Sequence, residues 1–401
     1  MLELLDTIDW SQTSSCYGSA EKIPSAIRGL ISDKTKTRHE ALSTLHMELE
    51  HQGSVYQASA YAVPFLLELV AAPQTPEKGE LVELLAYLGS GGAHLGKHFE
   101  SLERRLARQR IALRERKESL ALQELTRDDR RWSERTHQAV REGLPLLLPL
   151  LTDIDAAMRM KVTFLLTFFP EDRSWLLPPI ITQLTGEADE HVLCCLLLYL
   201  GHLLSPTPDA SRLLMQYLLE GETKFLRFSA ALALCALLKE EAPKEVIHFL
   251  LHALVSPYFM QIPDNLFPRE WSGSWSPMRA LFYLDQLTSS PHQTLIMERL
   301  IEIFPLLHEN IELECTDLLL RIAFYEKGFQ LYTPFEDLDL IQQAILQTLV
   351  AKETLWTKPS FDPFLDETTI PVPAPVSSLA YLGLPSTRQS LQAFIARSIR
   401  Q

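Results

Sequence analysis

Two histidines four residues apart have the side-chain types and the spacing of a metal-binding pair. On one helix, His94 and His98 would face the same side. A cytosolic zinc site needs a third and a fourth ligand at a recognisable spacing, and Glu100 or Glu103 is a poor substitute for them. We therefore favour the interpretation that both histidines are polar residues beside the Gly-rich joint Gly89–Gly92.

The sequence lacks the short motifs that carry known catalytic chemistry. There is no nucleophile elbow, no phosphate-binding Gly-rich loop, no HExxH pair and no paired-cysteine motif. Acidic residues and histidines are abundant, but they form no constellation at catalytic spacing. We therefore predict no catalytic residue, no cofactor, no cofactor-binding residue and no metal site, and we expect a protein that is not an enzyme.

An aromatic and proline-rich stretch, residues 256–276, has the composition of a binding loop. A long loop inside a compact helical array is usually functional or held down by its own aromatic side chains. Trp, Tyr and Arg are also the residue types that dominate the energetics of protein interfaces. The sequence leaves two interpretations of this loop: it packs over the helices, or it binds a partner. The residues that we predict to bind a partner here are Tyr258, Phe259, Phe267, Arg269, Trp271 and Trp275.

A basic segment, residues 97–135, departs from the acidic character of the chain. It contains 12 Lys and Arg against 8 Asp and Glu, so it carries a net charge of +4 and leaves −18 for the remainder. Its arginines alternate with leucines rather than with aromatic stacking residues, and Trp132 stands alone. A solvated helix face, an acidic protein surface and nucleic acid are the three interpretations. The candidate partner-binding residues at its centre are Arg104, Arg105 and Arg108.

Three arginines recur near the starts of apolar helices, at Arg38, Arg159 and Arg227. They could line a groove and bind an acidic ligand. The alternative is a structural role, in which each arginine bonds an acidic turn of its own or a neighbouring helical pair. The acidic residues available for that role are Asp33, Asp153, Asp155 and Glu222.

The elements that position these residues are repeated helices. Apolar helices with a polar start occur at Met158–Phe169, His191–Leu203 and Leu226–Leu238, and their starts lie about 33 to 35 residues apart. Each is preceded by a second apolar helical segment and by an acidic or Gly-containing turn. Two helices per unit at this period are the signature of an α-solenoid.

The turn and the start of the second helix resemble a HEAT repeat. In that pattern an apolar residue and Pro begin the first helix, an acidic turn follows, and Arg-x-x-Ala-x-x-x-Leu begins the second. The matching residues are Asp33, Arg38, Ala41 and Leu45, with a partial repeat at Asp153 or Asp155 and Arg159.

The first 70 residues or so are also similar to a group of bacterial HEAT-repeat proteins. The segments that carry this likeness are Tyr17-Gly18, Ile23-Pro24, His51–Tyr56 and Ala62–Leu66. The resemblance implies an armadillo-like α-solenoid whose surface binds other proteins. An immunity-type protein is one role found in such families. HEAT-like repeats also occur in enzymes, namely alkylpurine DNA glycosylases and phycobilin lyases, and these are the alternative.

We expect an all-α protein, a single right-handed α-solenoid of about seven or eight HEAT-like helical pairs over residues 1–401. Residues 97–135 are expected as a long helix or helical hairpin inserted into the array, and residues 357–384 as a Pro-rich extended strap. The predicted pairs are 23–30 with 37–50, 63–70 with 79–88, 143–151 with 158–169, 175–184 with 191–204, 209–219 with 225–238, 244–254 with 277–287, and 294–307 with 311–325, followed by an irregular pair at 335–352 and a terminal helix at 386–400.

The charge, the cysteines and the hydropathy of the chain indicate where the protein is located and which classes of partner it can bind. The net charge of −14 repels phosphate backbones, which disfavours nucleic acid as a partner. The five cysteines are odd in number and fall mainly in apolar helices, so we expect free thiols in the cytoplasm. The apolar runs Leu144–Leu151 and Val192–Leu200 are far shorter than the ~18 residues of a membrane span, and no signal peptide is visible.

Together these observations predict a cytoplasmic, non-enzymatic protein that binds a protein partner through a concave face and the aromatic loop. It would act as a scaffold or regulator, without a membrane and without nucleic acid. The sequence leaves the identity of the partner and the oligomeric state open.

Overall fold

The protein is described here from a computed structural model covering residues 2–51, 54–90, 119–260, 276–288, 291–325, 333–357, 379–380 and 382–397. Of residues 119–129 and Ser276, only the backbone is described. The chain divides into two compact units, called unit 1 and unit 2 below. Unit 1 comprises Met1–Gly96, Glu118–Ala233 and Asn265–Ser272, and unit 2 comprises Lys97–Lys117, Leu234–Asp264 and Gly273–Gln401.

Helices make up nearly all regular structure of the described residues, which confirms the prediction of an all-α protein. The strands there form two antiparallel pairs of two residues each. These are β1 (Ser14–Ser15) with β2 (Gly18–Ser19), and β3 (Glu50–His51) with β4 (Ser54–Val55). None of the described helices is long and apolar enough to cross a lipid bilayer.

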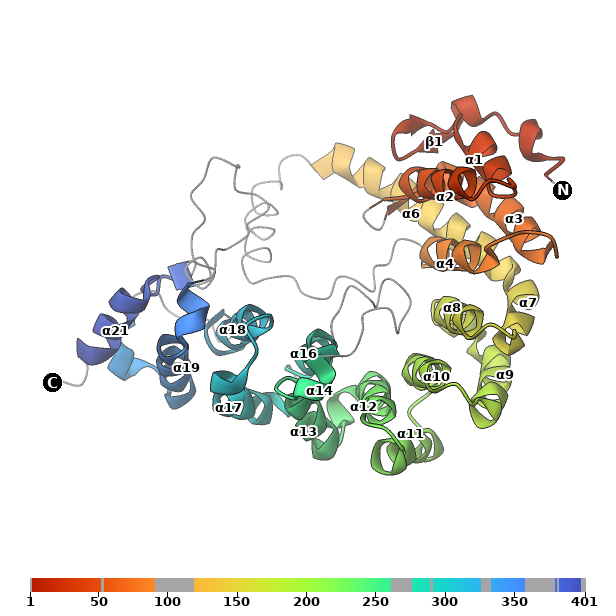
Figure 1. Cartoon of the computed structure of the whole chain (residues 1–401). Helices are drawn as coiled ribbons and strands as arrows, with labels where there is room; N and C mark the ends of the chain where they lie inside the picture. Colours follow the sequence, from red (N-terminus) through yellow and green to blue (C-terminus); the bar gives the residue numbers. More distant parts are fainter. Residues whose placement is uncertain are drawn as a thin grey trace. The chain divides into compact units, whose positions relative to one another are not determined.

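Unit 1 consists of helices that pair in sequence order and form two layers (Figure 1). One layer contains α2 (Thr35–Leu49), α4 (Lys78–Gly89), α8 (Ala156–Leu166) and α10 (Glu190–Leu203). The other contains α1 (Ile23–Gly29), α3 (Gln57–Ala71), α7 (Leu144–Leu147) with η4 (Leu148–Thr152), α9 (Arg173–Gly186) and α11 (Pro208–Glu220). Of α12 (Lys224–Leu238), the residues up to Ala233 belong to unit 1.

The helix α3 starts earlier than the sequence predicted, because Pro64 lies inside it and does not begin it. Ser59 fixes the true start: its Oγ accepts the backbone N–H of Tyr56 at 2.9 Å and donates to the carbonyl of Leu49 at 2.5 Å. Pro64 removes one hydrogen bond to the carbonyl of Ala60. Since Pro64 is on the exposed face and Ala60 is half-buried, water can satisfy that carbonyl, and the helix continues.

The core of unit 1 lies between the two layers and along α4, α8 and α10. A line of aromatic rings runs through it, with Tyr87 and Tyr199 on either side of Phe164 at 6.4 and 5.9 Å between centroids. Gly201 of α10 permits a close helix contact, since a Cβ there would lie 2.5 Å from the Cα and the carbonyl oxygen of Ala233 in α12. Apolar burial of this kind contributes about 25 cal/mol per Å², which makes this core the main source of stability.

The described part of the basic segment, residues 119–135, lies in α6 (Ser119–Glu142), a single helix that packs against α3 and α4. Its buried face includes Thr136 and Val140, both fully buried, so its C-terminal half belongs to the core of unit 1. Residues 97–118, with Arg104, Arg105 and Arg108, lie outside the described residues. The expected projecting insertion therefore stays a prediction for them.

Unit 2 contains further helices that pack in sequence order, with α13 against α16 and α17, α17 against α18 and α19, and α19 against α21. They are α13 (Lys244–Ala253), α14 (Pro257–Met260), α16 (Ser276–Gln286), α17 (Gln293–Ile303), α18 (Glu312–Leu320) continued by the π-helix η9 (Arg321–Tyr325), α19 (Leu340–Ala351) and α21 (Arg388–Arg397). Short 3-10 helices in the two units are η1 (Leu5–Thr7), η2 (Trp10–Gln12), η5 (Pro170–Asp172), η6 (Lys239–Glu241), η8 (Phe304–Leu306), η10 (Phe335–Asp337) and η11 (Glu353–Trp356).

A lysine at the end of α19 holds this helix to the turn between α17 and α18. Lys352 Nζ donates to the carbonyls of Pro305 and Leu307 at 3.0 and 2.9 Å and contacts Glu312 Oε1 at 3.0 Å. The Thr354 hydroxyl donates to the same carboxylate. The side chain of Glu312 is 1% exposed, so these bonds replace its lost hydration.

Candidate partner-binding surface

The aromatic loop is described only at its beginning. Phe259 is buried in α14 and contacts Phe249 edge to face at 6.1 Å between centroids, so its ring is part of the packing of unit 2. Tyr258 is 42% exposed and offers surface beside it. The remaining residues predicted there, Phe267, Arg269, Trp271 and Trp275, lie outside the described residues, and so do residues 358–378 of the strap predicted at 357–384.

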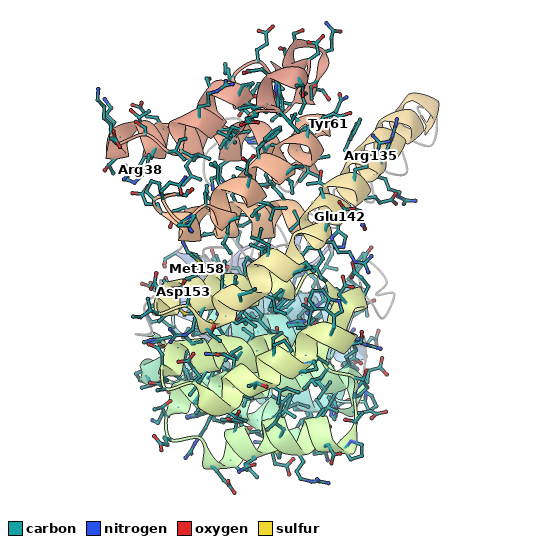
Figure 2. All side chains as sticks on the ribbon, turned by 90° about the vertical axis from the view of Figure 1, so that its right-hand side faces the viewer. Arg38, Tyr61, Arg135, Glu142, Asp153 and Met158 are labelled. Atoms are coloured by element: carbon teal, nitrogen blue, oxygen red, sulfur yellow. The ribbon has the colours of Figure 1, made fainter. Side chains whose placement is uncertain are left out.

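The three recurring arginines make the same contact in three helical pairs. Each guanidinium donates to the backbone carbonyl six residues before it, in the turn that precedes its helix. The distances are 3.0 Å from Arg38 to Ser32, 2.8 Å from Arg159 to Asp153 and 2.7 Å from Arg227 to Gly221. Figure 2 shows Arg38 and Asp153 on the same side of unit 1. The arginine therefore closes its own turn.

Two of these arginines also bind the next pair through a forked ion pair. Arg38 donates to Glu77 at 3.0 and 2.9 Å, and Arg159 donates to Glu187 at 2.8 Å through both nitrogens. The bonds from Arg38 hold the pKa of Glu77 below its usual value. The structural interpretation is confirmed, but the acceptors are turn carbonyls and these glutamates rather than the side chains of the predicted acidic turns. Such bidentate geometry fixes orientation as well as charge.

Metal and thiol chemistry find little support where the chain is described. Among the described residues, no group of three His, Cys, Asp or Glu side chains could hold a metal ion, and His94 and His98 lie outside them. Burial raises the pKa of the thiols of Cys194, Cys235 and Cys315, so these groups stay protonated near neutral pH and behave as small apolar side chains.

The exposed side of α6 carries an aromatic group flanked by two cations. The guanidinium carbons of Arg131 and Arg135 lie 5.2 and 5.0 Å from the ring centroid of Trp132. Tyr61 of α3 lies 6.2 Å from the same indole, and its side chain is 37% exposed. We call Tyr61, Arg131, Trp132 and Arg135 the Trp132 patch. Figure 2 shows Tyr61 on α3 next to Arg135 on α6.

Three contacts on the opposite flank set the rotation of α6 and so orient the patch. Arg141 forms a forked pair with Asp172 at 2.5 and 2.9 Å, and its bonds hold the pKa of Asp172 below the usual value. His137 bridges the carbonyl of Gly89 at 2.6 Å and Glu171 Oε1 at 2.7 Å. Because these bonds tie α6 to α4 and η5, the residues on its other side face away from the core.

The arginines of the patch differ from those that join helical pairs in their ion-pair partners. Neither Arg131 nor Arg135 forms an ion pair with a carboxylate of the described residues, and both are exposed. An open hollow of about 410 Å³ runs along this face of α6. It is lined by Arg131, Glu134, Arg135, Gln138, Ala139 and Glu142. The face therefore presents two cations whose N–H groups are available to a carboxylate or another acceptor.

The sequence analysis missed this patch, although part of its signal was visible. Trp132 was interpreted as standing alone, but Arg131 precedes it and Arg135 follows one helical turn later, within reach of its ring. Tyr61 comes from a helix 71 residues earlier, and nothing in the local pattern indicates that it lies beside Trp132.

No family model and no curated protein matches this chain. Among solved structures, an engineered protein, target OR497 of the Northeast Structural Genomics Consortium, matches with 16% sequence identity. The match covers 95% of this chain and 98% of that chain, at a TM-score of 0.30. A likeness of this size carries no inference about function, and the all-α architecture is described from the helices themselves.

Proposed function

We propose that this protein is a non-enzymatic binding module, a scaffold or regulator, whose protein partner docks on the Trp132 patch. The observation that carries the proposal is the pair of exposed guanidinium groups held over one indole beside a half-exposed tyrosine. Trp, Tyr and Arg are the residue types most enriched among the energetically dominant residues of protein interfaces. Here they form a contiguous patch over α3 and α6. The opposite side of α6 is buried in the core of unit 1.

The finer architecture is part of the same proposal. We infer that the helical pairs of both units are HEAT-like and that they follow one another in a right-handed α-solenoid in the cytoplasm. The support is the repeated contact of Arg38, Arg159 and Arg227 with the turn carbonyl six residues earlier. A crystal structure in which successive pairs turn with a left hand would contradict the inference.

A pull-down with two matched tryptophan variants tests the binding function. Full-length tagged protein, Trp132→Ala and Trp356→Ala are each incubated with a lysate of the native cells, and the retained proteins are identified. Trp356 is a suitable control because it is half-buried, as Trp132 is, but lies in η11 and outside the patch.

We expect one partner to be retained by the wild type and by Trp356→Ala and to be lost with Trp132→Ala. For an interface hot spot the loss is about 2 kcal/mol or more, roughly 30-fold in Kd. Retention of the same partners at equal strength by all three proteins would rule out the patch as the binding surface.

A further inference from the structure

The arginines of the Trp132 patch contact the indole in the absence of any partner. Each guanidinium lies about 5 Å from the same indole centroid, where cation–π attraction favours this rotamer. Long arginine side chains lose rotamer freedom when they bind, and a side chain already biased toward one rotamer loses less. The two cations of the patch therefore bind a ligand at a reduced entropic cost.

We propose that the Trp132 patch recognises an acidic peptide segment of a protein partner, with two carboxylates spaced to meet Arg131 and Arg135. The proposal rests on the proposed binding function and names the chemistry of its partner. Both guanidinium groups stand over one ring, so one short segment reaches both. In an extended peptide, carboxylates two residues apart lie on the same face at a backbone spacing of about 7 Å, which suits such a pair.

Charge complementarity is the argument for an acidic occupant. Most of the other arginines with described side chains are already bonded to acids of the chain, as Arg159 is to Glu187 and Arg141 is to Asp172. Arg131 and Arg135 have no such partner among the described residues. A carboxylate from outside would form charge-assisted, forked hydrogen bonds with each of them.

The same face argues for a peptide over a nucleic acid. Glu134 lies between the two arginines along α6, and Glu142 lies further along the same face, so a chain of phosphates would meet carboxylates. Two guanidinium groups lie about 5 Å from the indole centroid, so a base would have to compete with them for the ring. The net charge of −14 adds long-range repulsion against any polyanion.

Glu142 also predicts where a basic residue of the peptide would lie. It lies seven residues after Arg135 on α6, which is about 10 Å along the helix axis. Side chains of an extended peptide share a face only at even spacings, and four residues cover about 13 Å. A lysine four positions from the acidic pair therefore faces Glu142, and its long side chain spans the difference. The matching motif is acid, any residue, acid, three residues, then lysine.

Fluorescence anisotropy with a synthetic probe tests the proposal on the full-length protein. The probe is a fluorescein-labelled peptide, Gly-Glu-Leu-Glu-Ala-Ala-Ala-Lys-Gly, blocked at both ends. The comparison ligands are its charge-reversed form, with lysines for glutamates and glutamate for lysine, and a nine-residue oligothymidylate. The protein variants are Arg131→Ala with Arg135→Ala, Arg131→Glu with Arg135→Glu, and the remote control Arg212→Ala, whose side chain is 76% exposed on α11. Melting curves of all variants establish that they are folded.

We expect the acidic probe to bind the wild type and Arg212→Ala equally and at least 10-fold more weakly to the double alanine variant. The double glutamate variant should bind the charge-reversed peptide instead, which a merely structural role of the arginines would not produce. Tighter binding of the oligothymidylate than of the acidic probe, or equal binding by all variants, would overturn the proposal. If Trp132→Ala loses its partner in the pull-down but the probe does not bind, the binding function stands and the acidic-peptide inference fails.

Discussion

Arg159 and Glu187, 28 residues apart in the chain, join two successive helical pairs through two hydrogen bonds of 2.8 Å. The side chains are 13% and 4% exposed, so the pair is largely screened from water. A further bond from Arg159 to the carbonyl of Asp153 ties the same guanidinium to its own turn. One side chain thus fixes both the turn within a pair and the spacing between pairs.

Glu187→Gln should destabilise the protein by about 1–3 kcal/mol, because Arg159 keeps one uncharged oxygen acceptor and its second N–H group meets the amide NH2. Denaturant unfolding at pH 7 measures the change. The control is Arg212→Ala, since Arg212 and Asp209 form an exposed pair, 76% and 88%, whose loss should not change the midpoint measurably. An equal effect of both substitutions would show that the forked pair has no special role.

The loss of unfolding free energy caused by Glu187→Gln should depend on pH. Burial alone would raise the pKa of Glu187, but the bonds from Arg159, the backbone N–H of Asp189 and Gln183 outweigh it and hold the pKa below the usual 4.5. A carboxylate with a lowered pKa stabilises the fold above the pKa of the unfolded chain and loses this effect as pH falls through the folded value. The difference between wild type and variant should therefore be full at pH 7 and shrink below about pH 4.5, as unfolding curves at several pH values would reveal. A difference that stays constant down to pH 3 would contradict it.

Gly201→Ala should destabilise unit 1, because its new methyl group would lie 2.5 Å from backbone atoms of Ala233 and the helices would have to separate. Overpacking of this kind costs about 1–3 kcal/mol. Gly186→Ala is the matched control, since nothing lies within 4 Å of a Cβ at that position. Thermal melting compares the two; a melting temperature of Gly201→Ala equal to that of the control would contradict the close contact of α10 with α12.

Lys352→Ala should destabilise unit 2 by about 3 kcal/mol, because it removes a cation from the carboxylate of Glu312, whose side chain is 1% exposed. The carbonyls of Pro305 and Leu307 lose their donor in the same substitution. Lys36→Ala is the control, since Lys36 is 88% exposed and its ion pair with Glu40 spans one helical turn. Urea unfolding followed by circular dichroism measures both. A Lys352→Ala midpoint as high as that of Lys36→Ala would show that the contacts of Lys352 do not stabilise unit 2.

The positions of most helices could be predicted from the sequence alone. The three apolar segments at 158–169, 191–203 and 226–238 correspond to α8, α10 and α12, because an apolar helical period and a polar start depend on residues close together in the chain. A structural role for the recurring arginines was one of the two interpretations that the sequence offered, for the same reason. Each contacts a carbonyl only six residues away.

The start of α3 and the partners of the arginines were decided by tertiary structure. Pro64 can begin a helix or lie inside one, and the choice depends on the bonds of Ser59 with Tyr56 and Leu49 and on water at its exposed face. The sequence offered nearby acids for Arg38, but the fold brings Glu77 from the next pair, 39 residues away.

What the sequence by itself determined is the all-α composition, the helical period and the charge of the chain, since these follow from residue type and local spacing. Which side chains share a surface depends on how α3 and α6 pack. Tyr61 and Trp132 meet only because these two helices lie against each other. The Trp132 patch is therefore a product of tertiary packing, because burial of one side of α6 decides which residues remain on the other.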